Sequence, residues 1–215
     1  MKKILLFCMF MHGLYMNGLD QPKVVKIAVF CSGNNNIAPD LKIAAYGLGQ
    51  YLGLHCFGLI TGGGSLGLMK EVADGYVSRA ISLKEFRSVI LQSHMPDGHP
   101  AMSKENIICV KSLHDRMDYF YDTADAFIVL PGGLGTLHEL IDCLTHNKHM
   151  RKPIILLNGD GSWNNLIQQF QAIVTSNPDA DQYFTSLVVV NTLSECIKFL
   201  HTHCYCTSIS AMIGK

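Results

Sequence analysis

The stretch Ala126-Phe-Ile-Val-Leu-Pro-Gly-Gly-Leu-Gly-Thr-Leu-His-Glu139 decides the fold of this chain. Its first five residues, 126–130, form a short apolar run that predicts a buried strand. Pro131 ends the run, because proline cannot donate to a sheet ladder. Closely spaced glycines then allow the backbone to approach a ligand, and apolar residues recur at helical spacing over 136–144. The stretch therefore predicts a strand, a glycine loop and a helix.

The start of that helix is suited to an anion. Free backbone N–H groups and the positive end of the helix dipole both favour negative charge there. Glu139 falls about one turn into the helix, which places a carboxylate beside whatever the loop holds. We interpret the stretch as a phosphate site with an adjacent carboxylate. The alternative is a tight strand-to-helix turn with a solvated glutamate, since glycine loops are common in α/β proteins.

A second unit of the same kind lies earlier in the chain. An apolar run at 55–60 leads into Thr61-Gly-Gly-Gly-Ser-Leu-Gly67, and helical spacing follows over 68–77. The loop is not G-x-G-x-x-G with an acidic residue about 20 positions later, which disfavours a dinucleotide site. It also lacks the G-K-[ST] of a Walker A loop.

Strands and helices alternate along the rest of the chain. Further strands are expected at 24–31, 88–92, 106–111, 152–157 and 187–190, and further helices at 38–52, 112–125, 163–174 and 193–200. The strands are near-continuous apolar runs, which is typical of parallel strands covered on both faces. We therefore predict an α/β protein with one Rossmann-like domain, a doubly wound parallel sheet. Ligands bind outside the carboxyl ends of such strands, where both glycine loops, Ser32 and the helix that carries Arg116 all converge.

Composition limits the function classes. The chain has 215 residues, 48% hydrophobic and 16% charged, which fits one domain with a large core. Its formal net charge is zero, with 17 residues of each sign, so we expect no nucleic-acid polymer as a partner. No run approaches the roughly 20 apolar residues of a membrane span, so we expect no membrane partner.

Domain boundaries are expected at 1–22 for an N-terminal extension, 23–202 for the Rossmann-like domain and 203–215 for a C-terminal tail. Lys2 and Lys3 precede an apolar run at 4–11, as in a short signal peptide, but no small-x-small cleavage site follows. We expect a disordered or wrongly assigned extension and a cytoplasmic protein, with a secretory signal as the alternative.

The eight cysteines contain no C-x-x-C pair. Cys31, Cys56 and Cys109 lie in or beside apolar runs, so we expect buried, reduced thiols. The segment His201-Thr-His-Cys-Tyr-Cys206 could bind a soft metal, but its spacing matches no standard zinc pattern. We expect no metal.

Two glycine motifs resemble those of the LOG ("lonely guy") family. Pro131-Gly-Gly-Leu-Gly-Thr-Leu-His-Glu139 matches the family motif P-G-G-x-G-T-x-x-E, and Thr61-Gly-Gly-Gly-Ser-Leu-Gly-Leu-Met69 resembles G-G-G-x-x-G-L-M. Phe30-Cys-Ser-Gly33 is a looser version of the family's C-G-S segment, and His114-Asp-Arg116 lies where the family has M-H-x-R-K. The resemblance covers about residues 24–200. It implies a nucleoside 5′-monophosphate phosphoribohydrolase without a cofactor, a type that in some members releases cytokinins.

Three departures from the family pattern bear on specificity. Met117 stands where the family has a lysine, the segment 143–149 differs from the usual T-W-A-Q-L-G-like run, and the loop between residues 90 and 106 is unlike the usual one. The preferred base stays open. Family members are often labelled lysine decarboxylases, but no feature of the sequence supports a pyridoxal enzyme.

The resemblance assigns roles to individual residues. Glu139 would stabilise the positive charge that develops on the ribose, position water or hold the ribose hydroxyls. Arg116 would balance charge and hold the phosphate or the leaving base, for which a planar cation is suited. Substrate-binding residues are expected at Ser32, Gly63, Gly64, Ser65, Gly132, Gly133, Gly135, Thr136 and Asp142.

Each role has a structural alternative. Glu139 would be a solvated helix residue, Arg116 a surface partner of Asp115 or Asp118, and Asp142 an ordinary exposed residue. His114 and His138 are expected to be bystanders, because the family motif does not fix His138.

The same architecture also serves non-catalytic proteins. A carrier of a phosphorylated ligand, such as the molybdenum-cofactor carriers, would keep the glycine loops without needing both Glu139 and Arg116. The joint presence of these residues favours an enzyme, whereas the absence of lysine at position 117 keeps the carrier open. The resemblance further implies a homodimer that shares the ligand between glycine loops, with residues 137–144 at the interface.

Overall fold

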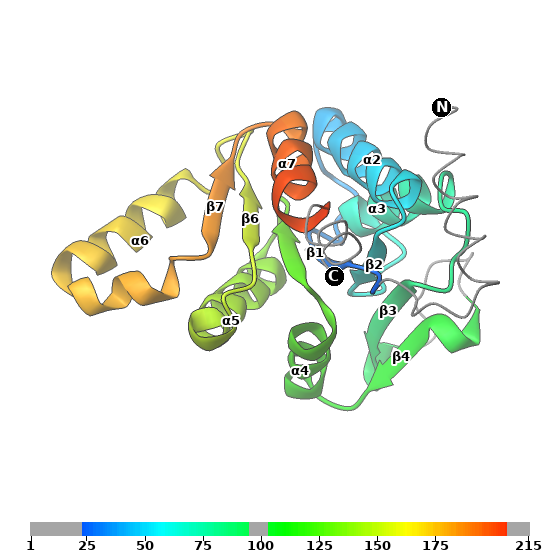
Figure 1. The fold of residues 1–215 in the computed structure, drawn as a ribbon, viewed down its shortest axis with the longest axis horizontal. Coiled ribbons are helices and arrows are strands. Elements are labelled where there is room, and N and C mark those ends of the chain that lie inside the picture. The colour runs from blue at the N-terminus through cyan, green and yellow to red at the C-terminus, as the bar shows by residue number, and fades with distance from the viewer. Residues whose placement is uncertain (1–22, 95–102, 206–215) are drawn as a thin grey trace, which may run out of the picture.

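The computed structural model describes residues 23–94 and 103–205. Their core is a seven-stranded parallel sheet with the order β4-β3-β2-β1-β5-β6-β7 (Figure 1). The strands are β1 Lys26–Phe30, β2 Gly58–Thr61, β3 Phe86–Leu91, β4 Ile107–Val110, β5 Ala126–Val129, β6 Ile154–Leu157 and β7 Leu187–Val190. The helices are α2 Pro39–Leu54, α3 Gly67–Val77, α4 Leu113–Thr123, α5 Leu134–Met150, α6 Asn164–Ser176 and α7 Leu193–Leu200. The predicted doubly wound fold is confirmed.

Helices cover both faces of this sheet. The side chains of β1 alternate between two cores: Ile27 and Val29 pack with α2, α3 and α7, whereas Ala28 and Phe30 pack with α4, α5 and α6. Figure 1 shows α7, α2 and α3 on one side of the strands and α4 and α5 on the other. The strand order reverses between β1 and β5. A doubly wound sheet binds its ligands at this switch point.

The helices α2 and α3 approach each other through glycines. A Cβ atom at Gly49 would lie 2.0 Å from the carbonyl oxygen of Val72, and one at Gly75 would lie 2.1 Å from that of Tyr46. Only a residue without a side chain permits this approach of two backbones. Gly49 and Gly75 therefore allow the two helices to pack closely.

We expect Gly49→Ala to lower the free energy of unfolding by about 2 kcal/mol, because overpacking against a fixed backbone exceeds the gain in helix propensity. Gly47→Ala in the same helix is the control. Its Cβ would meet only the end of the Leu193 side chain at 3.0 Å, so stability should stay unchanged or rise by up to about 1 kcal/mol. Urea unfolding measures both, and equal losses in the two variants would contradict the packing argument.

The ends of several elements differ from the sequence prediction. The helix α5 begins at Leu134 and reaches Met150, so it is longer than the predicted 136–144 at both ends. The strand β2 begins at Gly58 rather than at 55, because Cys56 adopts a left-handed conformation with φ 59° that ends α2 and turns the chain. A short 3₁₀ helix, Pro178–Tyr183, was not predicted. A capping box begins α4: Ser112 and Asp115 exchange backbone-to-side-chain hydrogen bonds of 3.0 and 3.1 Å.

The expectation of buried thiols is only partly correct. Cys31, Cys143, Cys196 and Cys204 are buried, whereas Cys56 and Cys109 are exposed. Cys56 lies in the turn before β2, and Cys109 lies on the edge strand β4, which has a neighbour on one side only. Cys31, Cys109, Cys143 and Cys196 are free thiols.

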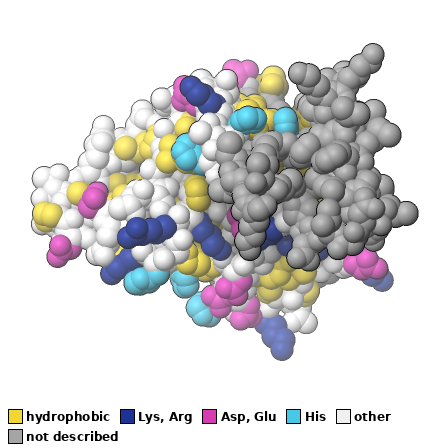
Figure 2. Space-filling model, viewed as in Figure 1, with side chains coloured by type: hydrophobic (Ala, Val, Ile, Leu, Met, Phe, Trp, Pro, Cys, Tyr) yellow, Lys and Arg dark blue, Asp and Glu magenta, His cyan; other side chains and the backbone are white. Residues whose placement is uncertain are grey.

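Several expectations fall outside the described residues. They concern the extension 1–22, the tail beyond residue 205 and residues 95–102 of the loop between positions 90 and 106. Within the ranges 23–94 and 103–205, no helix is long and apolar enough to cross a membrane. The same ranges contain no cluster of three or more histidine, cysteine or acidic residues that could hold a metal ion. Figure 2 shows basic and acidic side chains interspersed on the face that it presents.

Candidate functional site

Arg116 and Glu139 meet at the carboxyl edge of the sheet, beside the switch point. Nη2 of Arg116, from α4, lies 3.3 Å from Oε1 of Glu139, from α5. The Arg116 side chain is 16% exposed and the Glu139 side chain 10%. A solvated Glu139 is therefore excluded, and Arg116 is not the surface partner of a neighbouring aspartate.

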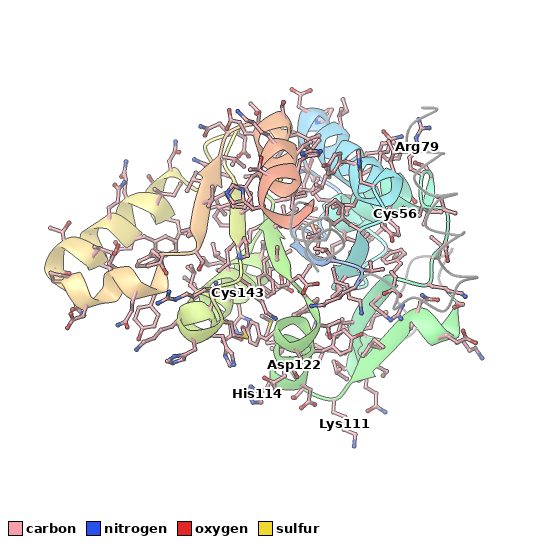
Figure 3. The ribbon with its side chains drawn as sticks, in the orientation of Figure 1. Cys56, Arg79, Lys111, His114, Asp122 and Cys143 are labelled. Carbon is pink, nitrogen blue, oxygen red and sulfur yellow. The ribbon has the colours of Figure 1, made fainter. Side chains whose placement is uncertain are left out.

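The aspartates next to Arg116 have partners of their own. Asp115 caps the start of α4, and Asp118 lies 3.5 Å from Nε2 of His114. Figure 3 shows His114 and Asp122 projecting from α4 away from the sheet. His114 is 82% exposed, and its part as a bystander stays a prediction. His138 is also exposed.

Three contacts besides Glu139 hold the Arg116 side chain. Its Nε donates to the carbonyl oxygen of Val89 at 3.1 Å, and its guanidinium carbon lies 5.6 Å from the centre of the Phe120 ring. Its Nη2 also lies against the backbone of Gly62, where a Cβ atom would be only 2.1 Å away. Gly62 and Val89 were missed by the sequence analysis. The triple glycine of the first loop marks close approach at this position, but it does not identify the group that approaches.

Burial gives Glu139 an unusual acidity. Desolvation raises its pKa from about 4.5 to about 7, and the nearby Arg116 limits this rise. Cys31 and Cys143 are buried close enough that Glu139 helps to raise the pKa of both thiols, although burial is the larger cause. Glu139 therefore exchanges a proton near neutral pH while the two thiols stay protonated. A carboxyl group with such a pKa is suited to electrostatic or acid–base catalysis.

The second glycine loop leaves the N-terminus of α5 open. Gly133 is the N-cap, and no side chain caps the helix. A Cβ atom at either Gly133 or Gly135 would meet nothing within 4 Å, and Leu134 between them is 84% exposed. Gly132 has a different role, since its Cβ would lie 2.1 Å from Oγ1 of Thr136, which is buried. The N–H groups at the start of α5 and the open space above them are suited to an anion.

The first glycine loop differs, because the chain itself occupies the N-terminus of α3. The carbonyl oxygen of Ser32 accepts hydrogen bonds from the N–H groups of Leu68 and Met69 at 2.9 and 3.4 Å. The side chain of Asn35 accepts one from Gly67 at 3.0 Å. The two loops look equivalent in sequence, but only the N-terminus of α5 is open to an external anion.

The predicted residues of the first loop fall into two groups. Ser32 connects backbone segments, because its N–H donates to Pro131 at 3.2 Å and its hydroxyl accepts from Asn34 at 3.0 Å. Gly63 adopts φ 80° and packs against Ile90, where a Cβ atom would lie 2.3 Å away. Gly64 and Ser65 are partly exposed. Ser32 and Gly63 therefore hold the backbone around the candidate site in place. Solvent reaches Gly64 and Ser65 of the first loop.

Asp142 is not brought to the Arg116–Glu139 pair by any contact among the described residues. It lines a shallow depression of about 340 Å³ with residues of α5: Leu134, Leu137, His138, Ile141 and Thr145. Together with burial and Cys143, its proximity raises the pKa of the Tyr121 hydroxyl on α4. Asp142 follows Glu139 by three positions, so its side chain points about 60° away from that of Glu139 around the helix axis. The two carboxylates therefore have different surroundings.

Comparison with known proteins identifies relatives of this chain. A family model described as "Possible lysine decarboxylase" matches residues 69–200. The cytokinin riboside 5′-monophosphate phosphoribohydrolase LOG7 of Arabidopsis thaliana is 37% identical over 147 residues, which cover 66% of this chain and 65% of LOG7. The enzyme LOG4 of the same plant is 31% identical over 196 residues, which cover 87% of both chains. The match to LOG7 thus spans slightly less than two thirds of that relative.

Solved structures share the fold at lower identity. The molybdenum cofactor binding protein of Rippkaea orientalis superposes with a TM-score of 0.60 at 23% identity, over 84% of this chain and 97% of that protein. The molybdenum cofactor carrier protein of Chlamydomonas reinhardtii gives a TM-score of 0.60 at 18% identity, over 84% and 98%. At these identities the likeness extends to the fold alone.

Proposed function

Because the chain belongs to the LOG family, whose named members are phosphoribohydrolases, we propose that it hydrolyses the N-glycosidic bond of a nucleoside 5′-monophosphate. The bond between ribose C1′ and the base nitrogen breaks, and the oxygen of water bonds to C1′. One proton passes to the base, so the products are the free base and ribose 5-phosphate. The observation that supports this most is the open N-terminus of α5 beside a buried Arg116–Glu139 pair.

The parts of the site match the parts of this substrate. The phosphate rests on the free N–H groups at the start of α5, and the helix dipole favours its charge. Glu139, one turn further along the helix, faces the ribose, where positive charge develops as the base leaves. Of the two helices that follow glycine loops, α3 has its N-terminus closed by Ser32 and Asn35. The N-terminus of α5 then remains for one phosphoryl group.

Arg116 balances the charge of this arrangement. Its guanidinium is a planar cation with several N–H donors, so it can contact Glu139 and the phosphate or base together. The Lys that the family has next to this arginine is replaced by Met117, which is 2% exposed and packs in the core. The proposed mechanism uses no pyridoxal group, in contrast to the decarboxylase description of the family model.

The proposal is tested by incubating the purified protein with AMP, GMP, CMP, UMP and a prenylated AMP. Chromatography quantifies free base and ribose 5-phosphate, with Glu139→Gln and Arg116→Ala in parallel. Base release that both substitutions abolish supports the hydrolase, and the ranking of substrates shows whether cytokinin release belongs to it. Release that survives Glu139→Gln would keep the reaction but overturn the role of Glu139.

A non-catalytic carrier of a phosphorylated ligand is the second candidate. Met117 in place of the family lysine and the folds of the two molybdenum-cofactor proteins favour it. Such a protein would be stabilised against heat by a nucleotide or another phosphorylated ligand without releasing any base. That combination of results would replace the hydrolase with the carrier.

Gly133→Ala should weaken phosphate binding without disturbing the fold. The added Cβ would enter the open space above the N-terminus of α5, where it meets no protein atom but excludes a bound phosphate. We expect the Kd of AMP to rise about tenfold or more, because the phosphate loses backbone hydrogen bonds, while the free energy of unfolding changes by less than about 0.5 kcal/mol. Calorimetric titration and urea unfolding measure the two effects. Unchanged binding would place the phosphate elsewhere.

The exposed face of α5 supports a homodimer. Leu134 and Ile141 are 84% and 39% exposed, and they line the depression on α5 that adjoins the phosphate loop. We expect Ile141→Glu to convert a dimer into a monomer, because a charge there would be buried without a partner. Ile173→Glu on α6 is the matched control, since Ile173 is 38% exposed on another helix. Sedimentation measures the mass, and a monomeric wild type would exclude a site shared between subunits.

The cysteines bear on the cellular compartment in which the protein acts. Cys31, Cys143 and Cys196 are free and buried, and Cys109 is free and exposed. Free thiols are typical of a reducing compartment, so we propose that the protein acts in the cytoplasm.

A further inference from the structure

We propose that Phe120 is a positioning residue of this site, whose ring fixes the Arg116 guanidinium in the orientation that faces Glu139. The inference rests on the proposed hydrolase only for its kinetic consequences. The contacts that support it are those of Arg116 with the Phe120 ring on α4, the Val89 carbonyl on β3 and the Gly62 backbone after β2.

The position of Phe120 in α4 places it directly beside Arg116. Residues four apart on a helix lie on the same face, and the guanidinium carbon lies 5.6 Å from the ring centre. A cation over an aromatic face within about 6 Å is attracted by the ring quadrupole, more strongly where water is excluded. The Arg116 side chain is only 16% exposed, so the ring replaces part of the hydration that the cation has lost.

The ring is itself immobile. Phe120 is fully buried and meets Phe30 edge to face, with the ring centres 5.0 Å apart and an angle of 87°. Phe30 is the last residue of β1 and stacks on Phe127 of β5 at 5.9 Å. The support of Arg116 is thus anchored to the two strands that flank the switch point.

Orientation matters here because one cation acts alone on Glu139. Among the described residues, Arg116 is the only ion-pair partner of Glu139, and Met117 supplies no second charge. The hydrogen bond from Nε to the Val89 carbonyl oxygen fixes one end of the guanidinium. By itself, this bond leaves the plane of the guanidinium free to turn. The Phe120 ring on one side and the Gly62 backbone next to Nη2 remove this freedom.

A displaced guanidinium would show in the titration of Glu139. Arg116 lowers the pKa of Glu139, so a weaker contact raises that pKa further. Among residues 23–94 and 103–205, the other titratable groups that interact with Glu139 are the thiols of Cys31 and Cys143, whose pKa burial raises well above the usual value, so they stay protonated across pH 5–8. A shift in the Glu139 midpoint therefore reports on Arg116.

The test compares Phe120→Leu with Phe127→Leu, which removes an equally buried ring from the same aromatic group without touching Arg116. The carboxyl carbon of Glu139 is titrated by NMR in ¹³C-glutamate-labelled protein, with Glu139→Gln to assign the signal. We expect the midpoint to rise by roughly half a pH unit in Phe120→Leu and to stay unchanged in Phe127→Leu. An unchanged midpoint in Phe120→Leu, or equal shifts in both variants, would overturn the positioning role.

The kinetic arm separates this inference from the proposed function. With AMP as the substrate, we expect the acidic limb of the kcat–pH profile of Phe120→Leu to shift to higher pH with the midpoint, and kcat at pH 7 to fall about twofold. The Phe127→Leu variant should keep the wild-type limb, whatever its stability. If the wild type releases no base from any nucleotide, the hydrolase fails, and the NMR titration alone decides the role of Phe120.

Discussion

Glu139→Gln is expected to lower kcat for base release about a thousandfold while making the folded protein more stable at pH 8. The loss of activity follows from the removal of the one carboxylate that faces the ribose in the proposed mechanism, since a single group of this kind contributes roughly 10²–10⁴-fold. The gain in stability follows from the burial of Glu139. Glutamine has nearly the same shape but no charge to desolvate.

The direction of the stability change depends on pH. The folded pKa of about 7 exceeds the unfolded value of about 4.5, so the folded protein binds more protons between these values, and its stability falls as pH rises through that window. Glutamine behaves like the protonated acid at every pH. The stability advantage of the variant should therefore be small at pH 5 and grow by about 2–3 kcal/mol by pH 8.

Urea unfolding of both proteins between pH 5 and 8 measures this difference. Asp142→Asn is the matched control, because Asp142 lies on the same helix and is not brought to Arg116. If the free energies of unfolding of wild type and Glu139→Gln change in parallel with pH, Glu139 is not a buried carboxyl group with a raised pKa. Retained base release would contradict its part in the reaction.

Arg116→Ala is expected to lower kcat/KM by two to three orders of magnitude at pH 7. The substitution removes the cation that limits the pKa of Glu139, so more of the carboxyl group is protonated at neutral pH. It also removes a fixed positive charge from the site where the phosphate and the developing charge must be balanced. Because Glu139 can take up a proton, the accompanying loss of stability should be smaller at pH 6 than at pH 8.

Arg116→Lys tests whether the shape of the cation matters. A lysine ammonium is a point charge and lacks the planar fork by which Arg116 donates from Nε to Val89 while Nη2 faces Glu139. We expect this variant to keep less than about a tenth of the wild-type kcat/KM, because it loses one of the charge-assisted contacts. Steady-state kinetics with AMP measures both variants. A lysine variant with wild-type activity would show that only the charge is required.

Much of the fold followed from local patterns. Apolar runs without alternation predicted buried parallel strands, because a strand covered on both faces has no solvent side. Glycine loops after two of these strands predicted a site at the carboxyl edge, and the resemblance to the LOG motifs indicated Glu139 and Arg116. These features are local because each depends on backbone geometry and burial within a few residues.

Other features depend on contacts that no local pattern contains. The glycine loops at 61–67 and 131–136 look alike in sequence, but Ser32 and Asn35 close the N-terminus of α3, and no such segment within 23–94 and 103–205 closes that of α5. The exposure of Cys109 likewise depends on β4 being an edge strand, which is a property of the strand order.

The sequence by itself determined the layered fold, the edge that carries the site and the two charged residues at its centre. Only the tertiary structure decided how these residues act together. Arg116 and Glu139 are separated by a helix, a strand and a loop in the sequence, but the packing of α4 and α5 on one face of the sheet brings them to 3.3 Å. The same packing excludes water and raises the pKa of Glu139 toward 7, because desolvation depends on every element that surrounds a group and not on its neighbours in the chain.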